Sequence, residues 1–423
     1  MSLLAAGLVG LALAGSDGLF ESAAVLLVAT ATLLALVGLA RRHDARERGA
    51  EVGLLGLACV AVGAAALTPG ELYASGPARA VSRGLAAGAA AIVLAAAVAV
   101  VAGRRRVATR LAVAGGGAAV GALVAMVVAS PRPRIDVCFM YQAASRALLH
   151  GHNPYLAHWT SGIRGEVSGQ FTYLPGSAVL LAPFHAVFGD VRYGLVAALV
   201  VTAWFVSRLG GRWAPVLAAA VLVFPGATFA TEQAWNDPLL MAALAGTVYA
   251  TRRGRTGWAV VSLAVALTCK QYAFLFVPLA AAWAPFGWRR ALRATAAAAA
   301  FVAPWALAAP GAFYDGVVRY NLDLPPRLDS LSLYAVAVRH GVVPGMLVVT
   351  VATGAALVLA ARRVRSDPRL FATAAGVVMA VYDLANKQSF FNEWELAAVL
   401  LVIGAACCAV QPAPEGLPVS AVP

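Results

Sequence analysis

Residues 84–106 read GLAAGAAAIVLAAAVAVVAGRRR, an uncharged apolar run from Gly84 to Gly103 that ends in three consecutive arginines. An apolar helix of about 20 residues spans the hydrocarbon core of a bilayer. Arginines that follow such a run are typical of its cytoplasmic end. The stretch therefore predicts a transmembrane helix whose cytoplasmic end lies at Arg104.

Similar runs follow one another along the whole 423-residue chain. Apolar residues make up 61% of it and charged residues only 12%, about half of the share found in soluble proteins. This composition excludes a soluble enzyme, a disordered chain and a disulfide-stapled secreted domain. We predict an all-α, polytopic transmembrane helical bundle of about 13–14 spans. The candidate spans are residues 2–15, 19–40, 51–69, 78–102, 107–130, 190–208, 213–230, 236–251, 257–270, 272–287, 293–309, 341–361, 369–385 and 393–410.

The net charge of +13 comes from arginines in the short gaps between these runs. This is the positive-inside pattern, so we expect no nucleic acid partner. If the arginine-rich gaps are cytoplasmic, the alternate gaps face outward. This alternation of gaps between the two sides of the membrane holds only if residues 171–189, which carry Pro175 and Pro183, form an interfacial or re-entrant helix rather than a span. The outward gaps are residues 70–77, 131–189, 231–235, 270–272, 310–340 and 386–392, and we expect the functional site in the two long ones, 131–189 and 310–340.

Asp136 opens the first long loop, and its position has two compatible interpretations. Residues 137–149 have the spacing of an amphipathic helix that lies on the membrane and ends at Gly151. A carboxylate just before such a helix caps its N-terminus. A carboxylate that is partly desolvated at the membrane interface is also suited to accept a proton at neutral pH.

The pattern that starts at Asp136 resembles that of known membrane glycosyltransferases. It reads Asp-x4-Tyr-x2-Ala, continues as Leu-x2-Gly-x2-Pro-Tyr up to Tyr155, and is followed by Tyr-x-Pro at residues 173–175. It is similar to the GT-C superfamily and, more narrowly, to the bacterial polyprenol-phosphate-mannose-dependent α-mannosyltransferases, which include the enzyme that extends phosphatidylinositol mannosides. The likeness covers about residues 107–410 and implies that Asp136 is the catalytic base. The family's Tyr-Pro-Pro is Tyr173-Leu174-Pro175 here.

This resemblance suggests a division of the chain into three parts. Residues 1–103 precede the usual start of the family and form an N-terminal transmembrane extension. Residues 104–410 form the GT-C-like transmembrane catalytic domain. Residues 411–423 are rich in proline and are expected to be a disordered tail.

Candidate substrate-binding residues lie in the outward gaps. The two lysines of the chain, Lys270 and Lys387, both fall at outward tips, where an ammonium suits a lipid phosphate; a chance placement in an arginine-rich composition stays open. Arg319 is the preferred guanidinium for the phosphate, and pairing with Asp315 or Asp323 is its alternative. The full set of candidates is Tyr141, Arg146, Asn153, Tyr155, Tyr173, Gln233, Asn236, Asp237, Lys270, Gln271, Arg319 and Lys387.

The sequence offers one weak candidate for a metal site. His150, His152 and His158 lie in the first long loop together with Glu166. No Asp-x-Asp pair accompanies them there, so we expect these residues to be polar loop residues and the protein to need neither a metal nor another cofactor.

The resemblance implies an inverting hexosyltransferase. The sugar, mannose in the family, would move from a polyprenyl-phosphate donor to a glycolipid or cell-envelope glycan, among membrane lipids at the extracytoplasmic face of a bacterial cell membrane. A multi-span lipid or sugar transporter (flippase) is the main alternative, because many spans with a few buried polar groups fit either class. A non-catalytic partner of an envelope enzyme is a third.

Overall fold

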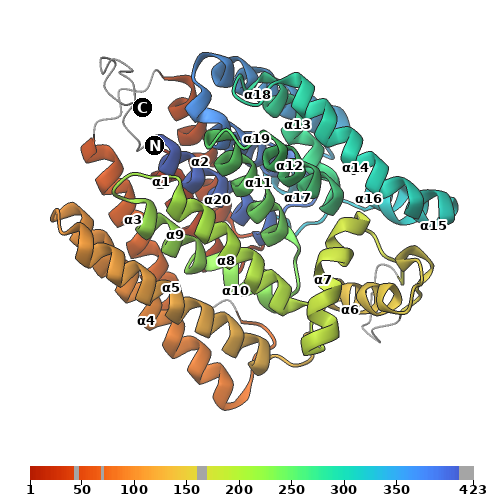
Figure 1. Cartoon of the computed structure of the whole chain (residues 1–423), viewed down its shortest axis with the longest axis horizontal. Coiled ribbons are helices and arrows are strands. Elements are labelled where there is room, and N and C mark those ends of the chain that lie inside the picture. Colours follow the sequence, from red (N-terminus) through yellow and green to blue (C-terminus); the bar gives the residue numbers. More distant parts are fainter. Residues whose placement is uncertain (42–46, 68–70, 160–168, 409–423) are drawn as a thin grey trace, which may run out of the picture.

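The computed structural model describes residues 1–41, 47–67, 71–159 and 169–408, and every regular element in these ranges is a helix (Figure 1). The predicted tail 411–423 and Glu166 of the first long loop lie outside the described residues. The elements are α1 (Ser2–Ser16), α2 (Ser22–Ala40), α3 (Glu47–Leu67), α4 (Gly76–Val101), α5 (Arg105–Ala129), α6 (Asp136–Leu149), η1 (Pro154–Leu156), α7 (Pro175–Phe188), α8 (Arg192–Arg208), α9 (Ala214–Leu222), α10 (Pro225–Glu232), α11 (Asp237–Arg252), α12 (Thr256–Cys269), η2 (Gln271–Leu275), α13 (Phe276–Ala282), α14 (Trp288–Ala308), α15 (Pro310–Tyr314), η3 (Asp315–Arg319), α16 (Tyr320–Asp323), α17 (Leu333–Arg339), α18 (Met346–Ser366), η4 (Pro368–Leu370), α19 (Phe371–Ala385) and α20 (Phe391–Cys408).

The predicted polytopic helical bundle is confirmed. Seven helices in the described ranges are long and apolar enough to cross a membrane, and two bent helix pairs raise this number to nine. The count of 13–14 spans includes shorter helices such as α1 and α12 and stays a prediction. The two helices of the pair α7 and α8 are bent by 117°, so α7 does not continue the path of α8, as the prolines of residues 171–189 led us to expect.

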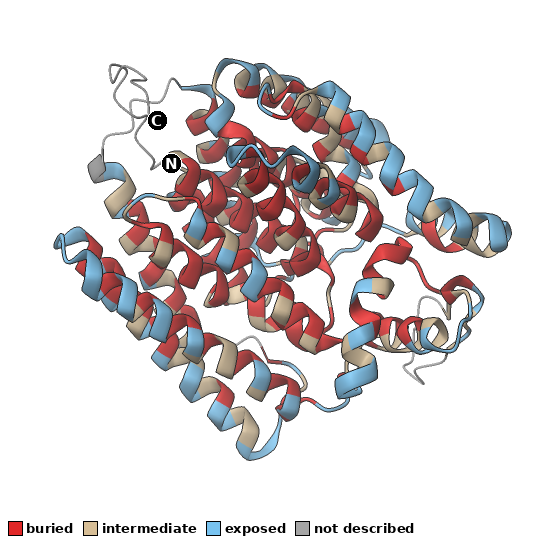
Figure 2. Ribbon diagram, in the orientation of Figure 1, coloured by how far each residue is buried: buried red, intermediate tan, exposed pale blue. Residues whose placement is uncertain are grey.

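The most buried helices lie in the middle of the bundle (Figure 2). Of the most apolar 18-residue stretch of each helix, 83% is buried in α20 and only 17% in α14. Exposed leucines such as Leu307 and Leu347 on the outer helices α14 and α18 suit contact with lipid tails. Small residues along α4 and α5, among them Ala89 and Gly115, let these two helices pack closely.

The N-terminal helices pack directly on the rest of the bundle. Helix α1 contacts α20, and α2 contacts α19, while Leu13 of α1 and Leu39 of α2 are completely buried. The boundary at residue 103 stays a prediction, but residues 1–103 are not a loosely attached segment in this structure.

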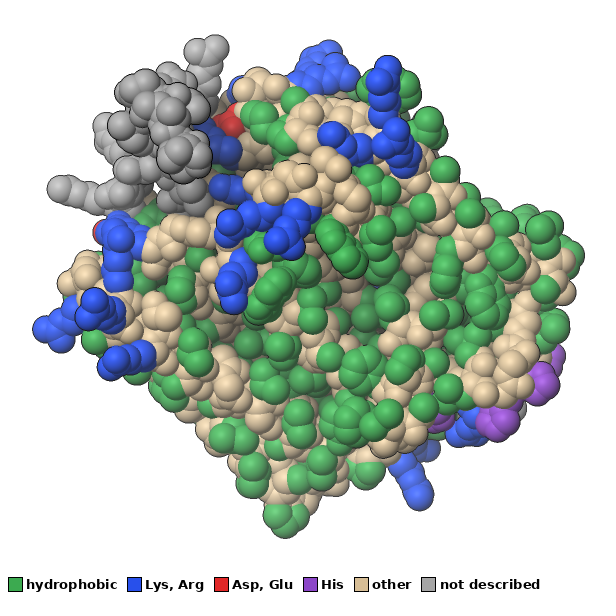
Figure 3. All heavy atoms as spheres, viewed as in Figure 1, with side chains coloured by type: hydrophobic (Ala, Val, Ile, Leu, Met, Phe, Trp, Pro, Cys, Tyr) green, Lys and Arg blue, Asp and Glu red, His purple; other side chains and the backbone are tan. Residues whose placement is uncertain are grey.

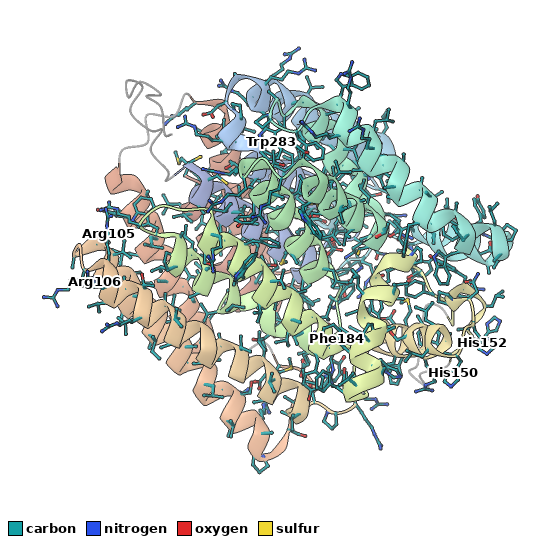
Figure 4. All side chains as sticks on the ribbon, viewed as in Figure 1. Arg105, Arg106, His150, His152, Phe184 and Trp283 are labelled. Carbon is teal, nitrogen blue, oxygen red and sulfur yellow. The ribbon has the colours of Figure 1, made fainter. Side chains whose placement is uncertain are left out.

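The two ends of the bundle differ in charge. Arg105 and Arg106, the first two residues of α5, lie at the left edge of Figure 4, whereas His150 and His152 of the first long loop lie at the lower right. Figure 3 shows most of the visible lysine and arginine side chains over the left and upper parts of the molecule. The helices α6, α7, α15 and α16 of the long loops gather at the opposite end.

Candidate active site

Hydrogen bonds join the predicted outward gaps to one another. Because these gaps are far apart in the sequence, the bonds show that the gaps meet at one end of the bundle, as the charge pattern predicts. The backbone N–H of Leu72 donates to Glu232 (2.8 Å), the amide of Gln271 donates to the carbonyl of Thr172 (2.8 Å), and the N–H of Arg327 donates to the carbonyl of Lys387 (3.1 Å).

A buried ion pair lies at the centre of this end. Lys270 Nζ is 2.8 Å from Asp237 Oδ2, and both residues are almost completely buried. Asn392 donates to the same oxygen at 2.9 Å, and the hydroxyl of Tyr272 donates to Oδ1. Asp237 is the first residue of α11 and precedes Pro238, so the helix dipole also favours its negative charge.

Aromatic rings enclose the ammonium of Lys270. Its Nζ lies 4.7 Å from the ring centre of Tyr272 and 5.7 Å from those of Tyr173 and Trp235. Glu393 contributes a second carboxylate at 4.0 Å. Cation–π attraction and the ion pair together hold a desolvated ammonium in a fixed place. The structure thus brings three predicted site residues, Tyr173, Asp237 and Lys270, into contact.

Asp136 is half-buried at the first residue of α6. Its Oδ1 accepts the N–H of Val137 at 2.8 Å, so it stabilises the first turn of the helix, while the N-cap position itself belongs to Ile135. Burial raises the pKa of Tyr320 to about 12, and the negative charge of Asp136 contributes to the shift. Arg327 also lies within electrostatic reach of Asp136. The charge of Asp136 therefore reaches the second long loop.

Tyr173 lies beside the buried ion pair and within electrostatic reach of Asp136. Its ring stacks on Tyr141 with centres 5.3 Å apart, and its carbonyl accepts the hydroxyl of Tyr155 at 2.8 Å. Burial raises the pKa of the Tyr173 phenol well above its ordinary value, and Tyr141, Asp136 and Asp237 add to the shift. Both carboxylates are therefore within electrostatic reach of the phenol.

Several predicted polar residues hold the loops in place. Asn153 donates to the carbonyl of Trp305 (3.1 Å) and accepts the N–H of Tyr155 (3.1 Å). Gln233 accepts the indole N–H of Trp235 at 3.2 Å. Asn236 donates to the carbonyl of Cys269 at 3.1 Å, while its Oδ1, fully buried, receives no hydrogen bond from the described residues.

The predicted cations other than Lys270 lie nearer the surface. Arg319 is 64% exposed and pairs with Asp323 at 3.3 Å and Asp315 at 3.6 Å, which is the alternative that the sequence left open. Lys387 is half-buried and donates to the carbonyl of Leu322 at 2.8 Å. Arg146 is exposed on α6.

Sequence reasoning missed several neighbours of these residues. Asn392 and Glu393 contact the Lys270–Asp237 pair, although they lie at the edge of the predicted gap 386–392. Asp383 and Glu395 are completely buried near Asp237, and their carboxyl oxygens receive no hydrogen bond from the described residues. A polar residue inside an apolar run was the available signal for both, because such residues usually serve a function.

The histidines of the first loop do not assemble a metal site. In the part of the chain that the structure describes, no three His, Cys, Asp or Glu side chains lie close enough together to hold a metal ion. His150 and His152 are exposed, and Glu166 is outside the described ranges. That the protein needs neither a metal nor a cofactor stays a prediction.

One comparison with known proteins identifies a family. The model of glycosyltransferase family 87 matches residues 171–386, which is just over half of the chain. No curated protein and no solved structure matches the chain. The matched region begins two residues before Tyr173 and contains Asp237 and Lys270, whereas Asp136 precedes it.

Proposed function

We propose, since this chain belongs to glycosyltransferase family 87, that it transfers a hexose from a polyprenyl-phosphate donor to a glycolipid or cell-envelope glycan. The family and the apolar helices make the protein a membrane-embedded glycosyltransferase. Membership also favours an enzyme over the transporter and the non-catalytic partner that the sequence left open. Mannose is the sugar that the resemblance to mannosyltransferases suggests.

The observation that carries the proposal is the position of Asp136. It is a half-buried carboxylate at the start of α6, at the end of the bundle where both long loops meet. Its charge reaches Tyr173, whose ring lies 5.7 Å from the ammonium of Lys270. A carboxylate in such surroundings is suited to act as a general base toward a sugar hydroxyl.

In the proposed reaction, Asp136 takes the proton of an acceptor hydroxyl as its oxygen attacks the anomeric carbon of the donor. The bond between that carbon and the phosphate oxygen breaks, and the electron pair leaves with the polyprenyl phosphate. A single displacement inverts the anomeric centre, so a β-linked donor yields an α-linked product. The products are the extended acceptor, free polyprenyl phosphate and a protonated Asp136.

Cations at this end of the bundle would stabilise the charge on the departing phosphate. Lys270 offers a buried point charge, and Arg319 and Lys387 lie nearer the surface, where a lipid headgroup meets water. Arg327, another outward arginine of the second long loop, lies within electrostatic reach of the base. Preorganised charges of this kind lower the barrier to charge separation.

The site is proposed to face the extracytoplasmic side of a bacterial cell membrane. The arginine-rich turns and the long loops lie at opposite ends of the bundle, which supports this orientation through the positive-inside rule. Such a placement gives the protein access to lipid-linked donors and to envelope glycans.

The test is transfer by purified protein in proteoliposomes that contain radiolabelled polyprenyl-phosphate mannose and an envelope lipid extract as acceptor. We expect Asp136→Asn to lose at least about 100-fold in rate, the usual contribution of a general base, while donor binding is retained. Asp367→Asn, at the arginine-rich end, is the matched control and keeps the wild-type rate. Full transfer by a folded Asp136→Asn protein would exclude Asp136 as the base.

A further inference from the structure

A loop of the N-terminal extension reaches the candidate active site. Residues 71–75 directly precede α4, and the backbone N–H groups of Leu72 and Tyr73 donate to the two carboxylate oxygens of Glu232 at 2.8 Å and 2.9 Å. Residues 1–170 lie outside the region that the family model matches. The contact therefore joins a matched residue to a segment that the family model does not cover.

Glu232 accepts these two hydrogen bonds inside the core. It is the last residue of α10 and is completely buried. A buried carboxylate is costly unless charge-assisted hydrogen bonds satisfy its oxygens, and here the peptide of the loop supplies one to each. The carbonyl of Glu232 accepts a hydrogen bond from the buried guanidinium of Arg192 at 3.3 Å, which fixes the end of α10.

The side chain of Tyr73 bonds to the segment that leads into Asp136. Its hydroxyl donates to the carbonyl of Arg134 at 3.0 Å, two residues before Asp136. Burial raises the pKa of the Tyr73 phenol, and the charges of Glu232 and Asp136 add to the shift. Tyr73 is thus bonded through its backbone to the buried carboxylate of Glu232, and through its hydroxyl to the segment that leads into Asp136.

A second loop of the extension contacts the other long loop. The N–H of Phe20, between α1 and α2, donates to the carbonyl of Asp329 at 2.8 Å. The guanidinium of Arg339 lies 3.8 Å from the ring centre of Phe20. The extension therefore touches the segments on both sides of the site, and these two contacts are independent of each other.

We infer that the N-terminal extension forms one wall of the transfer site, in which Glu232 holds the loop 71–75 so that Tyr73 fixes the segment leading into Asp136. Tyr73 and Glu232 are thus positioning residues for the proposed transfer, and the inference rests on that function. The physical requirement is geometric: a general base contributes fully only when it is held within hydrogen-bond reach of the attacking hydroxyl, and small displacements reduce the rate strongly.

Three variants of the full-length protein test this inference in the same proteoliposome assay. Tyr73→Phe removes only the hydrogen bond to Arg134, and we expect kcat to fall about 3- to 10-fold with the KM for donor within about twofold of wild type. Glu232→Gln loses one charged acceptor and is expected to lower kcat further. Tyr249→Phe, a half-buried tyrosine on α11 toward the arginine-rich end, is the matched control and keeps kcat.

A double-mutant cycle separates positioning from general damage to the fold. If Glu232 acts through Tyr73, adding Glu232→Gln to Tyr73→Phe lowers kcat by less than the product of the two single effects. Thermal unfolding in detergent is measured alongside, and Tyr73→Phe is expected to unfold within about 2 °C of wild type because its hydrogen bond lies at the surface.

Two results would overturn the inference: a wild-type kcat for Tyr73→Phe, or independent effects of the two substitutions on kcat. The proposed function fails differently, through full activity of Asp136→Asn. A dead Asp136→Asn protein together with a fully active Tyr73→Phe protein would leave the glycosyltransferase in place and remove only the role of the extension.

Discussion

Lys270 Nζ lies 2.8 Å from Asp237 Oδ2, and this buried pair joins the end of α12 to the start of α11. The carboxylate is also bound by Asn392 from α20. Three helices therefore meet at one pair of opposite charges, next to the aromatic ring of Tyr173. Removing one partner of such a pair leaves an uncompensated buried charge.

Lys270→Met is accordingly expected to destabilise the protein by about 3–5 kcal/mol. The double variant Lys270→Met with Asp237→Asn removes both charges and should recover a large part of this loss. Thermal unfolding in detergent measures both. If the double variant were as unstable as the sum of the two single variants, the two charges would not be coupled.

Arg327 and Arg319 are expected to differ in their effect on transfer. Both are exposed arginines of the second long loop that pair with aspartates, and the charge of Asp136 reaches Arg327. We expect Arg327→Ala to lower the transfer rate at least about tenfold through weaker stabilisation of the leaving phosphate, and Arg319→Ala to have the smaller effect.

The control for this comparison is Arg369→Ala. Arg369 forms a similar ion pair with the aspartate two residues away, Asp367, and is 44% exposed, close to the 46% of Arg327. It lies toward the arginine-rich end of the bundle. A larger loss for Arg319→Ala than for Arg327→Ala would identify Arg319, as predicted from the sequence, as the main guanidinium for the phosphate.

The helices and their ends could be predicted from the sequence because they depend on local features. Apolar runs and arginine-rich gaps predict the spans, and Gly151 marks the end of α6 close to the observed residue, Leu149. Alternation of the gaps also predicts which loops share an end. The same alternation places residues 70–77 at the end of the bundle where the long loops lie, so the position of Tyr73 at that end could be predicted.

The partners of the charged groups could not be predicted from the sequence. Asn392 is 155 residues from Asp237 and Leu72 is 160 residues from Glu232, and no periodicity reports contacts over such separations. That Lys270 binds a lipid phosphate as a point charge stays a prediction. Tertiary packing places its ammonium against Asp237 and three rings, which a one-dimensional pattern of charges does not reveal.

Acid is expected to weaken the second long loop through Asp329. The hydrogen bond from Arg327 lowers the pKa of the Asp329 carboxyl below its ordinary 3.8. Its contribution to stability is therefore fully present above about pH 4 and is lost as the pH falls through the lowered pKa. Asp329→Asn lacks this contribution at every pH, so its unfolding temperature in detergent should fall less between pH 5 and pH 3 than that of wild type.

A control for this pH dependence is Glu21→Gln, a substitution of an exposed acid beside α2. It should follow the wild-type curve. Equal losses for wild type and Asp329→Asn between pH 5 and pH 3 would mean that the Arg327–Asp329 pair does not contribute to folding stability.

Gly18→Ala tests how closely the extension must sit on the site. Gly18 has a φ of +70°, and a Cβ there would lie 2.3 Å from Phe391 Cβ and 2.8 Å from its backbone nitrogen. Because backbone atoms cannot move aside cheaply, we expect a loss of about 1–3 kcal/mol in stability and a lower transfer rate as the α1–α2 loop shifts away from Asp329. Gly15→Ala, where a Cβ meets nothing within 4 Å, is the control and should change neither quantity by much. Normal stability with normal transfer in Gly18→Ala would show that the site tolerates a displaced extension.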